Sequence, residues 1–573
     1  MASYAVCLVT FLRDHLIALP YAPRFKLGAC LVCHGAIGFV VNLFSKKYWP
    51  FRPLALVDIA QVAIILIAFL ADNPVPAQTE LSRVGGTNSS NATTANLPNL
   101  GDGSDMTPGA ERRLGDRIAR ELYRDPDYID DPVIMEYVQA IWQPLLAAAR
   151  LRGELPPELD AAYAWEILLG RDRTVNAFAL PGAYMGLHLG LVGVVATRDE
   201  LASVLAHELS HVTQRHISRM MSRQSEQAPW LLGAMILGML AASKSPTVAQ
   251  TAIVGGQAVA AQNQLNFSRD MEREADRVGF GVLTQAGFAP QGFVSMFEKL
   301  QQASRLNDTG GFPYLRSHPL TTERMSDLQA RVVQLPAATA TVLTMEHAMV
   351  SARARVLANS QVDALRLWEA DAEPARLTRL PGTVQAGGLY GAVLAATKLR
   401  SFALANVTLE RLVTLVSADA RAMRLARLLE AELALARGEP ARALATLQRI
   451  GDTDRATVLL RAQAGVQAAQ PIAVVQSVTQ SLQIWLSDHP RDAQAWQLLA
   501  GAYAAQGKTL SAVRAEAEVN VAQLDYPAAL ARLKAAQDMA RKGVAAGDHI
   551  EASIVDTRTR QVELFVREQA VER

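Results

Sequence analysis

The chain has 573 residues, enough for roughly three or more domains, and 50% of them are hydrophobic, enough for substantial cores. Acidic and basic residues nearly cancel to a net charge of +1 and form no basic stripe, so binding to nucleic acid is not indicated. The 3 cysteines, Cys7, Cys30 and Cys33, all precede residue 34, and disulfides therefore play no part in the remainder.

Residues 1–77 have the character of an N-terminal extension with a signal peptide. The apolar run Leu54–Ala71 follows Lys46 and Lys47, and small residues ending at Ala77 suit a signal peptidase. A retained membrane anchor is the alternative, because the run approaches the length that spans a bilayer. The next segment, 78–109, is rich in Gly, Ser, Thr and Asn and predicts a flexible linker.

A catalytic domain is expected over 110–335. Two helices are predicted between Glu111 and Arg150, and Ala164–Leu169 is a short strand candidate. The apolar, Gly-rich run Ala183–Val192 predicts a further strand, which we expect to be an edge strand that pairs with an extended substrate backbone. His188 lies on that run and is expected to be half-buried, without a metal role.

The next stretch, Leu201–His216, carries the pattern H-E-x-x-H. Its apolar residues recur at helical spacing, which predicts an amphipathic helix with one buried side. Residues four apart on a helix face the same way, so His207 and His211 can offer two imidazoles to one zinc ion. Glu208 follows the first ligand directly and can reach a water molecule on the metal, which makes it the candidate catalytic base.

A catalytic zinc site needs a third protein ligand. A His six residues after the second His is one known solution, but Ile217 occupies that position and His216 is one residue out of place. A Glu on a later helix is the other, and Ser268–Asp276 supplies it. Glu272 and Asp276 are four apart, so Glu272 can bind the metal while Asp276 holds a ligand His by a hydrogen bond.

Two apolar stretches, Pro229–Ala242 and Val248–Ala261, separate these helices. Neither is long enough to be read directly as a spanning helix, and short polar breaks flank them. We expect 229–261 to cover the active site or to touch a membrane peripherally. A hairpin inserted in the membrane is the alternative.

From about Ala337 the sequence becomes rich in Ala, Leu and Arg with helical periodicity, and an internal repeat emerges. Gly438-x-x-x-x-Ala443 and Gly507-x-x-x-x-Ala512 match each other 69 residues apart, close to two tetratricopeptide periods. Five positions fit the consensus of such a repeat: Trp496, Leu499, Ala500, Tyr503 and Ala512. Residues 336–573 therefore predict a helical-repeat domain with a concave surface for protein binding, a plain helical bundle being the alternative.

Taken together, the motifs resemble the zinc peptidases that include HtpX and the CAAX-prenyl endopeptidases, and most of all a BepA-like group of periplasmic proteases with a C-terminal tetratricopeptide array. The resemblance runs from about Leu97 to the C-terminus and includes Thr174–Ala179 and Ser317–Pro319. It implies that Glu272 is the third ligand and that Glu274 is a solvated or structural charge. It also implies that His318 is a fourth, regulatory ligand that can hold the enzyme idle.

Arg324, on the next predicted helix, is expected near the ligands, where it would face the cleft and stabilise transition-state charge. The fold predicted is mainly α: an α+β, gluzincin-like zinc metallopeptidase domain with a small sheet, followed by an α-solenoid resembling tetratricopeptide repeats. One zinc ion per chain, held by His207, His211 and Glu272, would activate a water molecule, with Glu208 as proton acceptor and donor.

The resemblance implies a periplasmic endopeptidase that degrades misfolded outer-membrane β-barrel proteins and assists their assembly. Its substrates would be proteins or peptides, and the repeats would bind clients or the outer-membrane assembly machinery. Two alternatives stay open. One is a chaperone-like assembly factor with a normally latent protease, and the other is an integral-membrane protease.

Overall fold

The computed structural model describes residues 106–222, 268–305, 311–334, 342–451, 453–467, 471–542 and 548–571. The predicted signal segment 1–77, almost all of the linker and the apolar segment 229–261 lie outside the described residues, so both membrane alternatives fall there too. Within the described ranges, no helix combines the length and the hydropathy that crossing a membrane requires.

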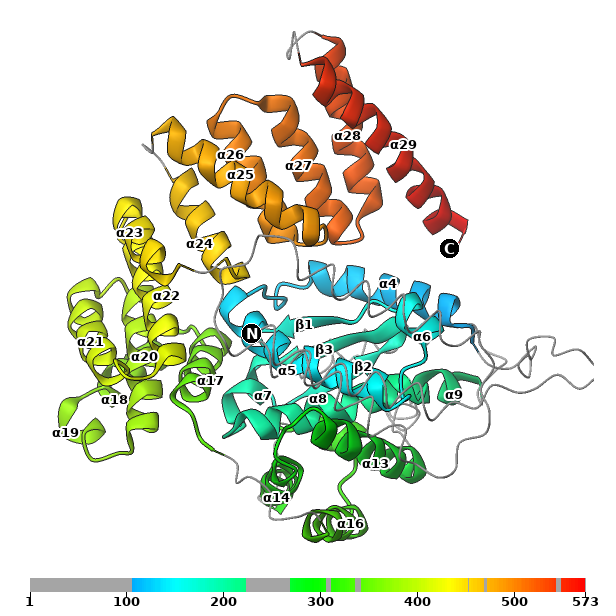
Figure 1. The fold of residues 1–573 in the computed structure, drawn as a ribbon, viewed down its shortest axis with the longest axis vertical. Coiled ribbons are helices and arrows are strands. Elements are labelled where there is room, and N and C mark those ends of the chain that lie inside the picture. The colour runs from blue at the N-terminus through cyan, green and yellow to red at the C-terminus, as the bar shows by residue number, and fades with distance from the viewer. Residues whose placement is uncertain are drawn as a thin grey trace, which may run out of the picture. The chain divides into compact units, whose positions relative to one another are not determined.

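The predicted protease region, which has described residues 106–222, 268–305 and 311–334, consists of helices around one three-stranded sheet (Figure 1). As predicted, two helices with a short connection come first, each begun by a side-chain cap from Thr107 or Asp131. The elements in chain order are α4 (Pro108–Arg124), α5 (Pro132–Leu151), α6 (Pro157–Ala162), β1 (Glu166–Gly170), β2 (Ala177–Leu180), the 3-10 turn η1 (Pro181–Ala183), β3 (Tyr184–His188), α7 (Leu189–Val194), α8 (Arg198–Thr213), α9 (His216–Ser222), α13 (Arg269–Gln285), α14 (Gln291–Arg305), α15 (Tyr314–Ser317) and α16 (Thr322–Val333).

The sheet has the strand order β1-β3-β2, with β3 parallel to β1 and antiparallel to β2. The predicted edge strand over 183–192 is therefore wrong in two respects. Only Tyr184–His188 is extended, and this strand lies in the middle because it hydrogen-bonds on both sides. The edge that faces the metal-motif helix α8 is β2.

Helix α8 is enclosed rather than half-exposed. Every residue from Glu200 to Thr213 is buried, because the helix packs against α5, α13, α14 and β2. The expectation of an amphipathic helix with one buried side is wrong for this reason. A helix with neighbours on all sides has no solvent face, and its polar residues must find partners inside the protein.

The C-terminal region, called the repeat region after its predicted repeats, extends from α17 to α29. In its described residues the regular elements are all helices, which pack one after another (Figure 1). The predicted consensus residues lie on two helices that pack together, with Trp496 and Tyr503 on α26 and Ala512 on α27. The helices are α17 (Met345–Ala358), α18 (Val362–Asp371), α19 (Pro374–Leu377), α20 (Gly382–Lys398), α21 (Phe402–Leu415), α22 (Ala420–Ala436), α23 (Pro440–Ile450), α24 (Arg455–Val466), α25 (Ile472–Asp488), α26 (Ala493–Ala505), α27 (Thr509–Ala522), α28 (Tyr526–Arg541) and α29 (His549–Val571).

The two glycines of the sequence repeat hold the same structural position. Gly438 follows α22 with φ 77° and Gly507 follows α26 with φ 71°, so both occupy the left-handed conformation that favours glycine after a helix. The short sequence match therefore marks equivalent turns in two helical hairpins. The mainly α fold with a small sheet is confirmed.

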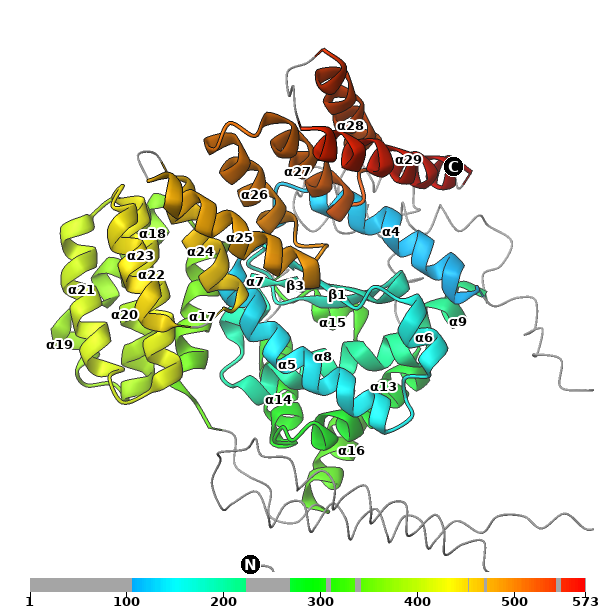
Figure 2. The same cartoon turned by 45° about the horizontal axis from the view of Figure 1, so that its top comes forward.

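Helix α17 joins the repeat region to the protease region. It packs against α7, as Figure 2 shows, and the buried His347 donates a hydrogen bond of 2.9 Å from Nε2 to the Val195 carbonyl oxygen. Because that carbonyl can only accept, the Nε2 atom carries the proton. A single apolar cluster extends from α5 of the protease region to α24 of the repeat region.

Candidate metal centre

Four side chains predicted from the sequence meet at one place. They are His207 and His211 of α8, Glu272 of α13 and His318 just after α15, and one ligand atom from each lies within 4.8 Å of the others. All four residues are buried. The structure thus brings together residues that are more than a hundred positions apart in the sequence.

The two α8 histidines present the same ring atom to the centre. Their Nε2 atoms are 3.0 Å apart, as the spacing of four residues on one helix allows. The Glu272 carboxylate faces both, with Oε2 at 3.5 Å from His207 Nε2 and Oε1 at 3.4 Å from His211 Nε2. Helix α13 can come this close because Gly279 has no side chain, and a Cβ there would lie 3.0 Å from the Ala206 carbonyl oxygen.

His318 is the fourth member of the group and contacts Glu272 and His207. Its Nδ1 lies 3.0 Å from Glu272 Oε1 and 3.3 Å from His207 Nε2, and its Nε2 lies 3.4 Å from Glu208 Oε1. The ring stacks on Tyr314, with ring centroids 4.5 Å apart. His318 therefore lies both among the ligand atoms and beside the candidate base.

Glu208 is fully buried next to the first histidine. Its Oε2 accepts a hydrogen bond of 3.0 Å from the backbone N–H of Ala179, on the edge strand β2. Burial raises the pKa of the Glu208 carboxyl, which brings it closer to the range that suits a general base at neutral pH.

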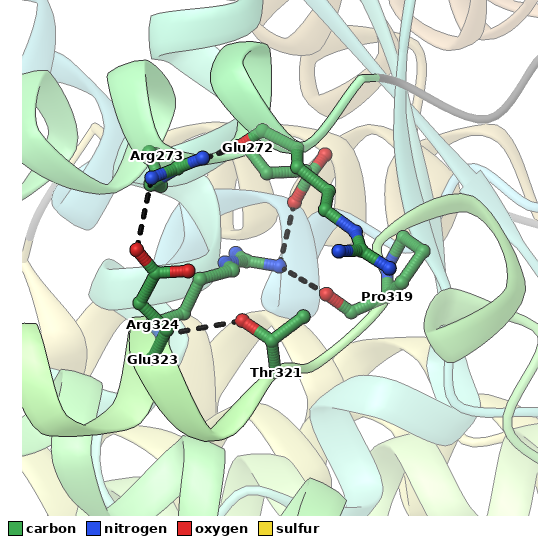
Figure 3. Close-up of a pocket in the computed structure, with 7 residues that line it drawn as sticks. Glu272, Arg273, Pro319, Thr321, Glu323 and Arg324 are labelled. Atoms are coloured by element: carbon green, nitrogen blue, oxygen red, sulfur yellow. Dashed lines mark hydrogen bonds and ion pairs between the residues drawn. The ribbon is translucent and has the colours of Figure 1, made fainter.

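Asp276 lies behind His207, on the side away from the centre, with Oδ1 at 3.0 Å from His207 Nδ1. Arg324 holds this carboxylate with two hydrogen bonds, from Nε to Oδ2 at 2.6 Å and from Nη2 to Oδ1 at 2.8 Å. Its Nη1 also lies 2.8 Å from Glu272 Oε2 and donates to the Pro319 carbonyl at 2.9 Å (Figure 3). Arg324 thus contacts the acids that support the centre, and this geometry favours a positioning role over direct contact with a substrate.

A small pocket opens beside this arrangement (Figure 3). It is lined by Arg269, Glu272, Arg273, Pro319, Thr321, Glu323 and Arg324. Arg273 donates to Glu323 across it at 2.9 Å, and both side chains are largely exposed. Glu272 lines this pocket but is itself almost fully buried.

Two further residues, His216 and Glu274, belong to the same network. The sequence reasoning rejected His216 as a ligand and took Glu274 for a solvated or structural charge, but it did not predict the contact between them. His216 is fully buried, with Nδ1 at 3.0 Å from His211 Nδ1 and Nε2 at 3.0 Å from Glu274 Oε2. Helical periodicity gives no signal for this contact, because residues five apart do not share a helix face. By contrast, His188 lies on β3 with Nδ1 at 2.9 Å from Thr174 Oγ1, outside the group of four.

Comparison with known proteins agrees with this geometry. Residues 136–332 match the model of Peptidase family M48. A Beta-barrel assembly-enhancing protease of Yersinia pestis is 30% identical over 437 residues, which cover 74% of this chain and 83% of that protein. This chain belongs to peptidase family M48.

Other relatives match shorter stretches. A Putative beta-barrel assembly-enhancing protease of Vibrio cholerae is 34% identical over 326 residues, and the chain covers 63% of its length. The Mitochondrial metalloendopeptidase OMA1 of Saccharomyces cerevisiae is 26% identical over 196 residues, or 54% of that protein. The predicted resemblance to BepA-like proteases and the predicted class, a metalloendopeptidase, are confirmed.

M48 peptidases depend on a metal ion, and the group of four fits one. Its donors are imidazole nitrogens and a carboxylate oxygen, all Lewis bases, gathered in a buried place. Burial lowers the pKa of His207, but its hydrogen bonds to Asp276 and Glu272 outweigh burial and raise that pKa to about 9. The carboxylates thus stabilise positive charge at this point, and a bound dication would take the place of the proton.

Proposed function

We propose that this chain is a zinc-dependent endopeptidase of the Gram-negative cell envelope that acts on outer-membrane β-barrel proteins. The observation that carries the proposal is the convergence of His207, His211 and Glu272, with Glu208 directly beside them. Three protein ligands with nitrogen and oxygen donors are the usual set of a catalytic zinc site, which keeps a fourth position for water or substrate.

When bound, zinc would polarise the scissile carbonyl and activate a water molecule for attack. Glu208 is the residue that accepts the proton of that water and returns it to the leaving amine. Its hydrogen bond to the Ala179 N–H holds the carboxylate in place, and its burial raises its proton affinity.

The substrate backbone is expected to pair with β2. This strand is at the edge of the described sheet and packs beside α8. An extended peptide can add to such an edge through main-chain hydrogen bonds, which would let one site bind peptides of different sequence. The Ala179 N–H that contacts Glu208 belongs to this strand, so the edge leads directly to the base.

Asp276 and Arg324 would act through the ligands. Asp276 fixes the orientation of His207 from the Nδ1 side, and Arg324 fixes both Asp276 and Glu272. His318 would compete with water for the fourth position and hold the enzyme idle until a client or partner displaces it.

The substrate class and location rest on the relatives, two of which are named for assisting β-barrel assembly. In this reading the chain enters the periplasm through the segment that ends near Ala77, and the helical repeats select clients or dock on the assembly machinery. The apolar segment 229–261 would contribute a peripheral membrane contact.

The test uses the purified full chain with zinc and an unfolded β-barrel protein. Wild type is expected to cleave it and to bind one zinc ion. Glu208→Gln is expected to keep the zinc but to cut about a hundredfold to ten-thousandfold more slowly, the usual contribution of a general base. Glu323→Gln, an exposed carboxylate near the site, is the matched control. Equal rates for wild type and Glu208→Gln would refute the peptidase mechanism.

A second candidate function is an assembly factor whose protease is normally latent. The position of His318 among the ligand atoms favours it. If this is the main function, Glu208→Gln will still support barrel assembly in cells, whereas deletion of the repeats after residue 336 will not. The opposite pattern would make proteolysis the main function.

A further inference from the structure

His211 is supported on the side that faces away from the metal group. We infer that His216 and Glu274 form a relay that positions His211 for zinc, with Glu274 acting only through His216. The inference rests on the zinc site proposed above and adds two positioning residues to it. Neither residue is within the group of candidate ligands.

The hydrogen bonds of the relay have one consistent direction. If His211 gives the lone pair of Nε2 to the metal, its Nδ1 carries the proton and must donate. The acceptor at 3.0 Å is His216 Nδ1, which leaves the proton of His216 on Nε2. That N–H donates to Glu274 Oε2 at 3.0 Å, and Arg219 Nη1 donates to the same oxygen at 2.9 Å. Every donor thus meets an acceptor.

The backbone is bent to make this contact. Helix α8 ends at Thr213, and Arg215 adopts φ 53° before α9 begins at His216. On a continued helix, a residue five positions on would lie about 140° around the axis from His211 and could not touch it. A left-handed conformation is unfavourable for a residue other than glycine. The turn brings the His216 ring to 4.9 Å from the His211 ring, edge to face.

The other histidine of α8 is supported in a parallel way. Asp276 Oδ1 lies 3.0 Å from Nδ1 of His207, just as His216 Nδ1 lies 3.0 Å from Nδ1 of His211. Asp276 and Glu274, the acid behind His216, are both on α13, which also carries Glu272. The three acids of the segment E-x-E-A-D therefore have different roles. Glu272 faces the metal group, Asp276 orients His207, and Glu274 orients His211 through His216.

The relay predicts an effect on metal affinity, because such partners fix the tautomer and the ring orientation and raise the basicity of the ligand. Losing one typically weakens metal binding about tenfold to a hundredfold. A residue with a merely structural role would change the stability of the metal-free protein instead. Metal affinity and metal-free stability therefore separate the two roles.

The experiment compares full-length wild type, His216→Gln, His216→Asn and Glu274→Gln. In His216→Gln the side-chain amide can still donate to Glu274, but no acceptor replaces Nδ1 opposite His211. In His216→Asn the side-chain oxygen can replace Nδ1 as acceptor, but the side chain is too short to reach Glu274. Asp270→Asn, on an exposed acid of the same helix end, is the matched control. The measurements are the zinc dissociation constant by chelator competition, the visible spectrum of the Co²⁺-substituted chain and the thermal midpoint without metal.

We expect His216→Gln to bind zinc at least about tenfold more weakly and to change the Co²⁺ spectrum, with a smaller effect for His216→Asn and Glu274→Gln. Metal-free midpoints should stay near wild type. Affinities within about twofold of wild type, or losses that only follow a lower metal-free midpoint, would overturn the relay. If His216 variants do not fold, Glu274→Gln alone decides. Absence of zinc binding by wild type would instead refute the proposed metal site.

Discussion

Arg353 of α17 and Asp131, the N-cap of α5, form a buried ion pair although 222 residues separate them. Nη2 of Arg353 lies 2.7 Å from one Asp131 oxygen and 2.9 Å from an oxygen of Glu432. Nη1 donates to the hydroxyl of the buried Tyr390 at 3.1 Å. One guanidinium therefore joins the protease region to two helices of the repeat region.

Arg353→Met is expected to destabilise the chain by about 3–5 kcal/mol, because it leaves Asp131 and Glu432 without their cation in a buried place. The measurement is urea-induced unfolding followed by circular dichroism. The control is Arg376→Met, whose partner Asp371 is exposed, and this change should cost less than about 1 kcal/mol. Equal unfolding curves for the two variants would contradict the prediction.

A second junction predicts a pH dependence. Asp492 caps α26 through Ala495 N and accepts hydrogen bonds from Arg455 at 2.7 and 2.9 Å and from Trp485 at 2.9 Å. Arg455 also binds Asp130, so this junction again reaches the protease region. Burial raises the pKa of the Asp492 carboxyl, but the bonds from Arg455 and the other donors outweigh burial and place that pKa below its ordinary value.

A carboxyl whose pKa is lower in the folded chain stabilises the fold above its unfolded pKa of about 3.9, and this contribution is lost as the pH falls through the folded pKa. Asp492→Asn should therefore cost about 2 kcal/mol at neutral pH, and the difference from wild type should shrink below about pH 4. Urea unfolding of both proteins across this range measures it. A difference that stays constant or grows on acidification would contradict the assignment.

The metal ligands could be predicted from the sequence because their spacing follows from helix geometry. His207 and His211 share a face, and Glu272 and Asp276 share another. The strand order could not be predicted, since nothing local distinguishes a central strand from an edge strand when both are short and apolar. The predicted role of 183–192 as an edge was wrong for that reason.

Contacts that depend on a turn, or on two residues far apart in the chain, could not be predicted from the sequence either. His216 reaches His211 only because Arg215 adopts a left-handed conformation, and an arginine gives no sequence signal for that conformation. The pairing of Arg353 with Asp131 depends on how two regions pack, and a single sequence gives no measure of that. The burial of α8 on all sides is likewise a tertiary result.

Arg324 supplies a prediction that couples stability to the metal. Arg324→Met leaves the buried carboxylates of Glu272 and Asp276 without their guanidinium, so the metal-free chain should lose about 3–5 kcal/mol. A bound dication would compensate both acids, and zinc should therefore raise the melting temperature of this variant more than that of wild type. Thermal melts with and without zinc measure both effects. Arg273→Met, at an exposed ion pair nearby, should match wild type. An equal shift by zinc in Arg324→Met and wild type would contradict the coupling.

The last prediction concerns His318. Its ring lies among the ligand atoms and 3.4 Å from Glu208, so it occupies the space that water and substrate need. His318→Ala should keep zinc, because three ligands remain, and should cleave an unfolded protein faster. If the closed arrangement holds about 90% of the molecules, the rate rises about tenfold. Initial rates and metal content are measured together, with Arg316→Ala, an exposed residue of the short helix α15 that precedes His318, as the control. An unchanged rate with zinc retained would mean that His318 does not limit access, and loss of zinc would make it an essential ligand rather than a switch.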